Sequence, residues 1–186
     1  MLEEAIIHNQ KDKFIITCEL APPKGTDVSM LSDMSLKLNK IVDAVNLTDG
    51  QGGNMRMCPL AAATVLLKNN IDVIWQITCR DRNRIALQAD CLGASAIGIK
   101  NVLPMKGDDP KSGDHPEAKG VFDIDSTELI KTINKLNQGF DMSGKELKGK
   151  TNFPHLPLSG QRHRAKRVGV SFCQPVTGAG MEPQLH

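Results

Sequence analysis

Apolar segments suited to strands alternate along the chain with segments of helical periodicity, and this alternation constrains the fold most. Strands are expected over residues 13–20, 42–48, 71–78 and 95–105, and helices over residues 28–41, 59–70, 82–92 and 126–137. Strands that alternate with helices pair in parallel, because parallel neighbours need a crossover connection. The sequence therefore predicts an α/β fold around a parallel sheet, with one further strand expected over residues 167–173.

Two architectures fit this pattern, a doubly wound open sheet and a (β/α)8 barrel. The strands are continuous apolar runs, as expected where both faces of a sheet are covered. In both architectures the functional groups gather in the loops that follow the strands. These loops are polar and rich in Gly or Pro, and they read CELAPPKG, TDGQGGN, QITCRDRN and KGDDPKSGDHPEAKG. We therefore expect a site at the carboxyl-terminal edge of the sheet.

The charged run CRDRNR, residues 79–84, allows two interpretations. It could bind a phosphate at the start of a helix, or it could be a capped, salt-bridged helix start, which we favour. Asp81 is expected to cap this helix and Gly93 to end it. Ser126 is expected to cap the helix over 126–137.

Composition excludes several classes of protein. Hydrophobic residues make up 40% of the 186 residues, and no apolar run approaches the roughly 20 residues of a membrane-spanning helix. The acidic, polar start MLEEAIIHNQ is unlike a signal peptide. An odd number of cysteines without a CxxC pair argues against a disulfide framework and a structural zinc site, and for a reducing cytoplasm. The cysteines are Cys18, Cys58, Cys79, Cys91 and Cys173.

The last part of the chain is basic, with the cluster QRHRAKR at residues 161–167. Such a cluster can bind nucleic acid. No aromatic residue interrupts it and the chain has no Tyr, so a solvated segment is the favoured interpretation. We expect no nucleic-acid partner.

Glu19 ends the first strand and is followed almost at once by Pro22 and Pro23. The period of two places Glu19 on one side of the strand with Ile15 and Thr17. Partial desolvation there would raise its pKa and suit a general acid. A solvated glutamate at a strand end is the equally weighted alternative.

Other polar residues also follow strands. Asp108 lies in KGDDP, where Gly107 would let the backbone approach a ligand closely. Thr48 and Asp49 follow the second strand, and Gln76 lies late in the third. Each could contact a ligand or be a buried, paired group, and a common turn is the simpler explanation for Asp108.

The segments CELAPPKG, AVNLTDGQGGNMRM, ITCRDRNRIALQADCLGASAIGIKNVL and GDDPKSGDHPEAKGVFDIDS, in this order, resemble the methylenetetrahydrofolate reductase family. The resemblance covers about residues 10–153. It implies a (β/α)8 barrel with a flavin at its carboxyl-terminal face, and reduction of 5,10-methylenetetrahydrofolate to 5-methyltetrahydrofolate.

The resemblance also implies roles for single residues. Glu19 matches the acid that protonates the folate as its five-membered ring opens, before a hydride passes from the reduced flavin. Asp108 matches a carboxylate that contacts the folate and influences the flavin.

The remaining matched positions concern the cofactor, which the family indicates is FAD rather than FMN. Thr48 matches a flavin contact, and Gly107 and Asp108 belong to the same cofactor-binding set. Gln76 stands where many members carry His, and Lys106 stands where some carry Arg near the phosphates or ribityl chain. NADH, NADPH or a redox partner protein remains open as the electron donor.

The resemblance ends after TNF at residues 151–153. We therefore expect residues 1–153 to form roughly half of a barrel, and residues 154–186 to be an atypical basic tail, as a shifted reading frame or damaged gene would produce. A full barrel needs about 250 residues, so the chain is expected to be inactive alone or to need another subunit.

Three functions stay open at this point. The first is the folate reductase, and the second is a non-catalytic half-barrel that binds another subunit. The third is a pterin-binding methyltransferase barrel, which would need no flavin. Homo-oligomers and a redox partner subunit are both compatible with the sequence.

Overall fold

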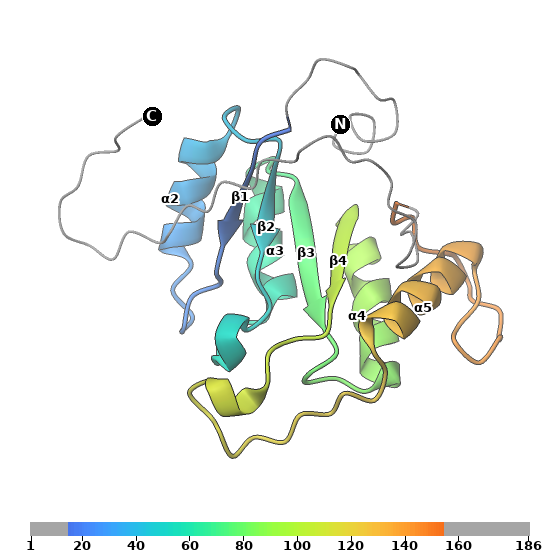
Figure 1. The fold of residues 1–186 in the computed structure, drawn as a ribbon. Helices are drawn as coiled ribbons and strands as arrows, with labels where there is room; N and C mark the ends of the chain where they lie inside the picture. The colour runs from blue at the N-terminus through green and yellow to red at the C-terminus, as the bar shows by residue number, and fades with distance from the viewer. Residues whose placement is uncertain (1–14, 155–186) are drawn as a thin grey trace.

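The computed structural model describes residues 15–154, which fold into a parallel sheet covered by helices (Figure 1). The strands are β1 Thr17–Leu20, β2 Ala44–Leu47, β3 Val73–Thr78 and β4 Asn101–Met105. The helices are α2 Ser29–Leu38, α3 Pro59–Lys68, α4 Arg84–Ala96 and α5 Ser126–Gln138, with short 3-10 turns η1 Gln51–Gly53 and η2 Pro110–Ser112. The predicted alternation of strands and helices is confirmed within the described residues.

The ends of α4 differ from those predicted. Asn83, not Asp81, caps the helix, because its side-chain oxygen accepts hydrogen bonds from the amides of Ile85 at 3.1 Å and Ala86 at 3.0 Å. Gly93 lies inside the helix and does not end it. The continuation to Ala96 shortens the strand expected over 95–105, which begins only at Asn101.

The cap of α5 lies one residue before the predicted Ser126. Asp125 accepts a hydrogen bond from the Glu128 amide at 2.7 Å, and the Glu128 side chain accepts one from the Asp125 amide. This reciprocal capping box satisfies two amides at the first turn. Gly139, with φ of 90°, ends the helix in the left-handed conformation that glycine adopts without strain.

The strand order is β1-β2-β3-β4, with every neighbouring pair parallel. Crossovers between parallel strands are nearly always right-handed, so strands added in one direction place their helices on one face. In Figure 1, α3 and α4 lie together behind the sheet. A doubly wound sheet reverses its strand order at a switch point, and the described sheet has no reversal.

The core lies between the sheet and its helices. The strand residues on this face are at most 2% exposed and comprise Val45, Leu47, Val73, Trp75 and Ile77. Leu31, Leu66 and Leu87 of the helices are fully buried in the same cluster. Burying such side chains removes most of their apolar surface from water, which is the main stabilising term for this layer.

The opposite face is not the uniformly apolar surface expected from the sequence. The register places Glu19 beside Asn46, and Gln76 beside Leu103. Leu103 is 41% exposed and Met105 is 37% exposed, so the described helices leave the β4 side of this face open, whereas Gln76 on the same face is 7% exposed. The strands are therefore apolar toward the helices and mixed in polarity on the other side.

The two edges of the described sheet are β1 and β4. The Met105 carbonyl accepts the Cys79 amide at 3.1 Å, so Met105 directs its backbone groups toward β3 and its neighbour Pro104 directs its own away. Proline has no N–H to donate and is tolerated at such an edge.

No helix among residues 15–154 has the length and apolar character to cross a membrane. The strand expected over 167–173 and the tail from residue 155 onward lie outside the described residues.

A pair of leucines in α4 tests the placement of the core. Leu87 is fully buried and Leu92 is 39% exposed. Leu87→Ala should lower the free energy of unfolding by about 2–5 kcal/mol through lost burial and the cavity left behind. Leu92→Ala is the matched control and should change it by less than about 1 kcal/mol, since both residues favour helix. Urea unfolding followed by circular dichroism measures both, and equal losses would contradict the assigned helix face.

Candidate active site

The loops after the strands meet at the carboxyl-terminal edge of the sheet, where sequence analysis placed the site. We define the β2 loop as residues 48–58, the β3 loop as 79–83 and the β4 loop as 106–125. The Thr48 amide donates to the Leu20 carbonyl at 3.1 Å, so β1 and the β2 loop stay paired beyond the last residues of their strands.

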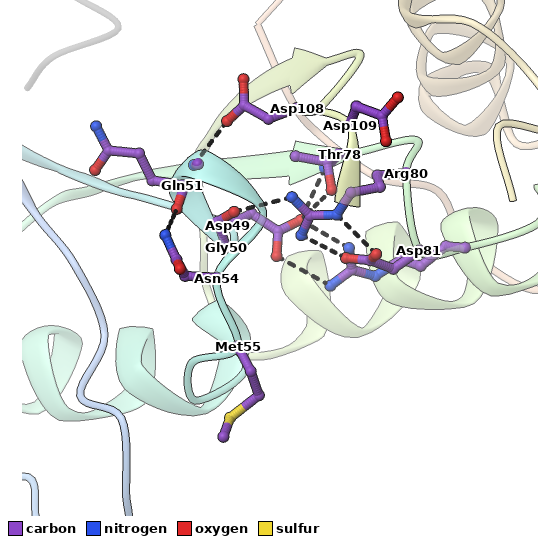
Figure 2. Close-up of polar contacts among 12 residues, drawn as sticks. Asp49, Gly50, Gln51, Asn54, Met55, Thr78, Arg80, Asp81, Asp108 and Asp109 are labelled. Atoms are coloured by element: carbon purple, nitrogen blue, oxygen red, sulfur yellow. Dashed lines mark hydrogen bonds and ion pairs between the residues drawn. The ribbon is translucent and has the colours of Figure 1, made fainter. Parts of the chain in front are cut away.

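A buried carboxylate, Asp49, joins the β2 loop to β3 and α4 (Figure 2). Its Oδ2 accepts hydrogen bonds from the Thr78 amide at 2.8 Å, the Thr78 hydroxyl at 3.0 Å and Arg82 Nη1 at 2.7 Å. Arg82 also donates through Nε to Asp90 of α4 at 2.8 Å. Burial alone would lower the pKa of Arg82, but the carboxylates of Asp49 and Asp90 outweigh it and raise the pKa, so the guanidinium stays charged.

Arg80 makes a second set of contacts in the same region. It donates to the Gly50 carbonyl at 2.9 Å and, through Nε and Nη2, to both oxygens of Asp81 at 2.7 Å. The hydrogen bonds to Asp81 are the main cause of its raised pKa. Gly50 has φ of 59°, and a Cβ there would collide with Arg80 Nη2.

These contacts confirm the salt-bridged interpretation of CRDRNR. Arg84 completes the set with Asp123, at 2.8 Å between Nε and Oδ2. The guanidinium groups of Arg80 and Arg82 are the two buried cations of this segment, and both already bind carboxylates. They are therefore not free to bind a phosphate, which was the alternative interpretation.

Asp108 lies in the β4 loop and reaches across to the β2 loop. Its Oδ2 accepts a hydrogen bond from the Gly52 amide at 2.7 Å, and Figure 2 shows the carboxylate directed at the η1 turn. The link brings the ends of β2 and β4 together above β3. No direct hydrogen bond joins Asp108 to Glu19 within residues 15–154, although both lie at the carboxyl-terminal edge.

Glu19, Thr48 and Gln76 come from three adjacent strands. Glu19 is half-buried beside Asn46, and Gln76 is 7% exposed. Thr48 is 1% exposed, and its Oγ1 has no hydrogen-bond partner among the described residues. An unpaired buried hydroxyl costs about 1–3 kcal/mol, which a hydrogen bond to a ligand would recover.

Lys106 and Gly107 lead from β4 to Asp108. Lys106 is exposed, and its ammonium lies 5.9 Å from the centre of the Phe122 ring. Gly107 has φ of 89°, and a Cβ there would lie 2.9 Å from the Cβ of Arg80 and 3.0 Å from that of Thr78. Position 107 therefore needs glycine both for its backbone conformation and for the close approach of the β3 loop.

A pocket of about 340 Å³ opens between the β2 loop, the β3 loop, the β4 loop and the start of α3. Arg56, Cys58 and His115 are among its lining residues. The pocket is lined by none of the six site residues predicted from the sequence, which are Glu19, Thr48, Gln76, Lys106, Gly107 and Asp108.

Two cysteine thiols near the site, those of Cys79 and Cys91, are buried. Burial raises the pKa of the Cys79 thiol to about 11 and that of Cys91 to about 12, so both stay protonated at neutral pH. Residues 15–154 contain no group of three side chains suited to hold a metal ion.

The sequence left Asp49 open as a ligand contact or a buried, paired group, and the structure shows that it is buried and paired, whereas Gly52 had no predicted role. The available signals were a carboxylate directly after a strand and three glycines in the five residues of GQGGN. Neither signal identifies a partner, because Asp49 binds Arg82 and Gly52 binds Asp108 across long separations in sequence.

Comparison with protein families gives a match over most of the chain. A family model described as methylenetetrahydrofolate reductase matches residues 4–145 of the 186-residue chain. This range contains the four strands and all six predicted site residues. A search of curated proteins gave no significant match.

Two arginines near the start of α4 test the Asp49 network. Arg82→Met leaves a buried carboxylate without its cation and should lower the free energy of unfolding by about 3 kcal/mol. Arg84→Met is the control, because its partner Asp123 is at the surface and such pairs contribute little. Urea midpoints of the two variants measure the difference. A loss for Arg82→Met no larger than that for Arg84→Met would show that the Asp49 ion pair does not anchor the loops.

Proposed function

Because the chain belongs to the methylenetetrahydrofolate reductase family, we propose that it reduces 5,10-methylenetetrahydrofolate to 5-methyltetrahydrofolate with a bound flavin. The observation that carries the proposal is the buried, unpaired hydroxyl of Thr48 at the carboxyl-terminal edge of the sheet. It lies among residues that could hold a cofactor and a substrate, at the edge where parallel α/β sheets bind ligands.

The sheet is proposed to be half of a (β/α)8 barrel. Two features support this architecture: the strand order runs in one direction, and the described helices leave one face open. In a barrel the uncovered face becomes the interior, which suits the polar side chains of Glu19, Asn46 and Gln76 on that face.

The residues proposed to hold the flavin, for which FAD is preferred over FMN, are Thr48, Gln76, Lys106, Gly107 and Asp108. Thr48 offers a hydroxyl that has no protein partner, and Lys106 offers an exposed cation for a phosphate or ribityl oxygen. Gln76 offers an amide that can both donate and accept. A reduced flavin supplies the hydride when bound, and NADH, NADPH or a redox partner protein would replenish it.

Glu19 and Asp108 are proposed to act on the folate. Glu19 donates a proton to a ring nitrogen of the folate as the five-membered ring opens, which leaves the methylene carbon ready to accept the hydride. Asp108 has one oxygen held by the Gly52 amide and contacts the folate with the other. We place this chemistry in the cytoplasm, where the thiols expected from the sequence would stay reduced.

The half-barrel that binds another subunit remains the second candidate. Leu103 and Met105 support it, since both are apolar and more than a third exposed on the uncovered face. Stable complex formation without flavin binding would favour this candidate. Methyl transfer to or from a pterin without any flavin would instead favour a methyltransferase.

Replacing the Thr48 hydroxyl tests the cofactor site. Thr48→Val keeps the shape but removes the unpaired group, so the flavin-free chain should be at least as stable as the wild type. FAD binding should weaken by about tenfold, as expected for one lost hydrogen bond. Thr64→Val, at a half-buried position of α3, is the control. Titration of flavin fluorescence measures affinity, and an unchanged affinity in Thr48→Val would remove Thr48 from the site.

Replacing the proposed acid tests the reaction. Glu19→Gln retains the size of the side chain but cannot donate its proton, so folate reduction should fall by about 10²–10⁴-fold while flavin binding persists. Glu117→Gln is the control, because Glu117 is a solvent-exposed glutamate of the β4 loop. Flavin reoxidation by the folate is followed in a stopped-flow spectrometer. Wild-type turnover in Glu19→Gln would exclude the assigned role.

A further inference from the structure

The orientation of Asp108 depends on a backbone group of another loop. Its Oδ2 accepts the Gly52 amide at 2.7 Å, and its Oδ1 has no hydrogen-bond partner among residues 15–154. Asp108 itself is exposed. An exposed carboxylate would otherwise sample several rotamers, so the Gly52 amide selects one and leaves the second oxygen for a ligand.

The turn that carries this amide is pressed against the turn that follows Asp108. A Cβ added at Gly113 would overlap the Gly53 carbonyl oxygen and lie 2.9 Å from the Gly53 Cα. A Cβ at Gly53 would lie 3.1 Å from the Asp109 carbonyl oxygen. The turns η1 and η2 can pack at this distance only because both positions lack side chains.

Gly113 serves packing and not backbone conformation. Its φ of −103° and ψ of −164° are extended values that any residue can adopt. The glycine is therefore needed for space alone, which makes an alanine there a clean probe of the distance between the two turns.

Further contacts hold the same two loops together. The Ser112 hydroxyl lies 2.6 Å from the Asp109 carbonyl and 3.4 Å from the Gly52 carbonyl. Asp114 accepts a hydrogen bond from the Met55 amide at 2.9 Å and forms an ion pair with Lys24, which lies between β1 and α2. The hydrogen bonds from Lys24 and the Met55 amide lower the pKa of Asp114 to about 2, so this anchor is ionised at neutral pH.

We propose that the turns η1 and η2 form one unit that orients the Asp108 carboxylate, and that Gly113 is its positioning residue. Gly113 acts through Gly53 and the Gly52 amide, without contact to any ligand. What Asp108 then does in the reaction rests on the proposed function, whereas the coupling between Gly113 and Asp108 does not.

Amide hydrogen exchange at Gly52, read by NMR in the full chain, tests the coupling directly. Asp108→Ala removes the acceptor and should speed exchange at Gly52 by about tenfold, since one hydrogen bond is lost. Gly113→Ala should produce a similar increase by forcing the turns apart. Gly25→Ala, which has open space around its Cβ, is the matched control and should change nothing.

Wild-type exchange at Gly52 in folded Gly113→Ala would overturn the proposal. If Gly113→Ala does not fold, Asp108→Ala still tests whether the Gly52 amide is held by the Asp108 carboxylate, because an exposed side chain can be removed without steric conflict. Unchanged Gly52 exchange in Asp108→Ala would likewise overturn it.

The reduction potential of bound FAD tests the consequence for the site. Removing or displacing a carboxylate near the flavin should raise the potential, so Asp108→Ala and Gly113→Ala should shift it in the same direction, and Gly25→Ala should not. A wild-type chain that binds no FAD would count against the proposed function alone, since Gly52 exchange still tests the coupling. An unshifted potential in Gly113→Ala, with a shift in Asp108→Ala, would overturn the positioning role.

Discussion

The arrangement of the loops depends on the buried carboxylate of Asp49. An ionised group at 6% side-chain exposure is tolerated only if it is paired and hydrogen-bonded. Asp49 receives an amide and a hydroxyl from Thr78 and the guanidinium of Arg82. Because these partners belong to β3 and to the loop before α4, one side chain fixes the start of the β2 loop against two other elements.

The β2 loop can therefore place its backbone accurately above the sheet. From Asp49 the chain turns through Gly50 and Gly52, both in left-handed conformations, and directs the Gly52 amide at Asp108. The ion pair between Asp49 and Arg82 thus holds the loop whose Gly52 amide orients the Asp108 carboxylate. Glu19 lies at the same edge on β1, the strand next to β2.

Much of the fold could be predicted because hydrophobic periodicity and turn residues are local signals. The limits of α4 could not, because Asp81 and Asn83 are both good caps and only the structure shows that Asp81 binds Arg80. Gly93 was taken as a helix end, yet nothing lies within 4 Å of its Cβ position, and the helix tolerates it at a small cost.

The site could be predicted only in part, and for a different reason. Residues at strand ends can be recognised singly, as Glu19 and Asp108 were. Their partners cannot, since Asp49 and Arg82 are 33 residues apart and Gly52 and Asp108 are 56 apart. The polar residue Asn46 of the uncovered face was also missed, because its apolar neighbours Val45 and Leu47 hide it in the sequence pattern.

The central claim is that a flavin binds at the carboxyl-terminal edge of this sheet. The most direct measurement is the change in backbone amide NMR signals when FAD is added to the chain. The account predicts that the largest changes occur at Thr48, Gln76 and residues 106–108. Absence of binding, or changes confined to the pocket around Arg56 and His115, would contradict it.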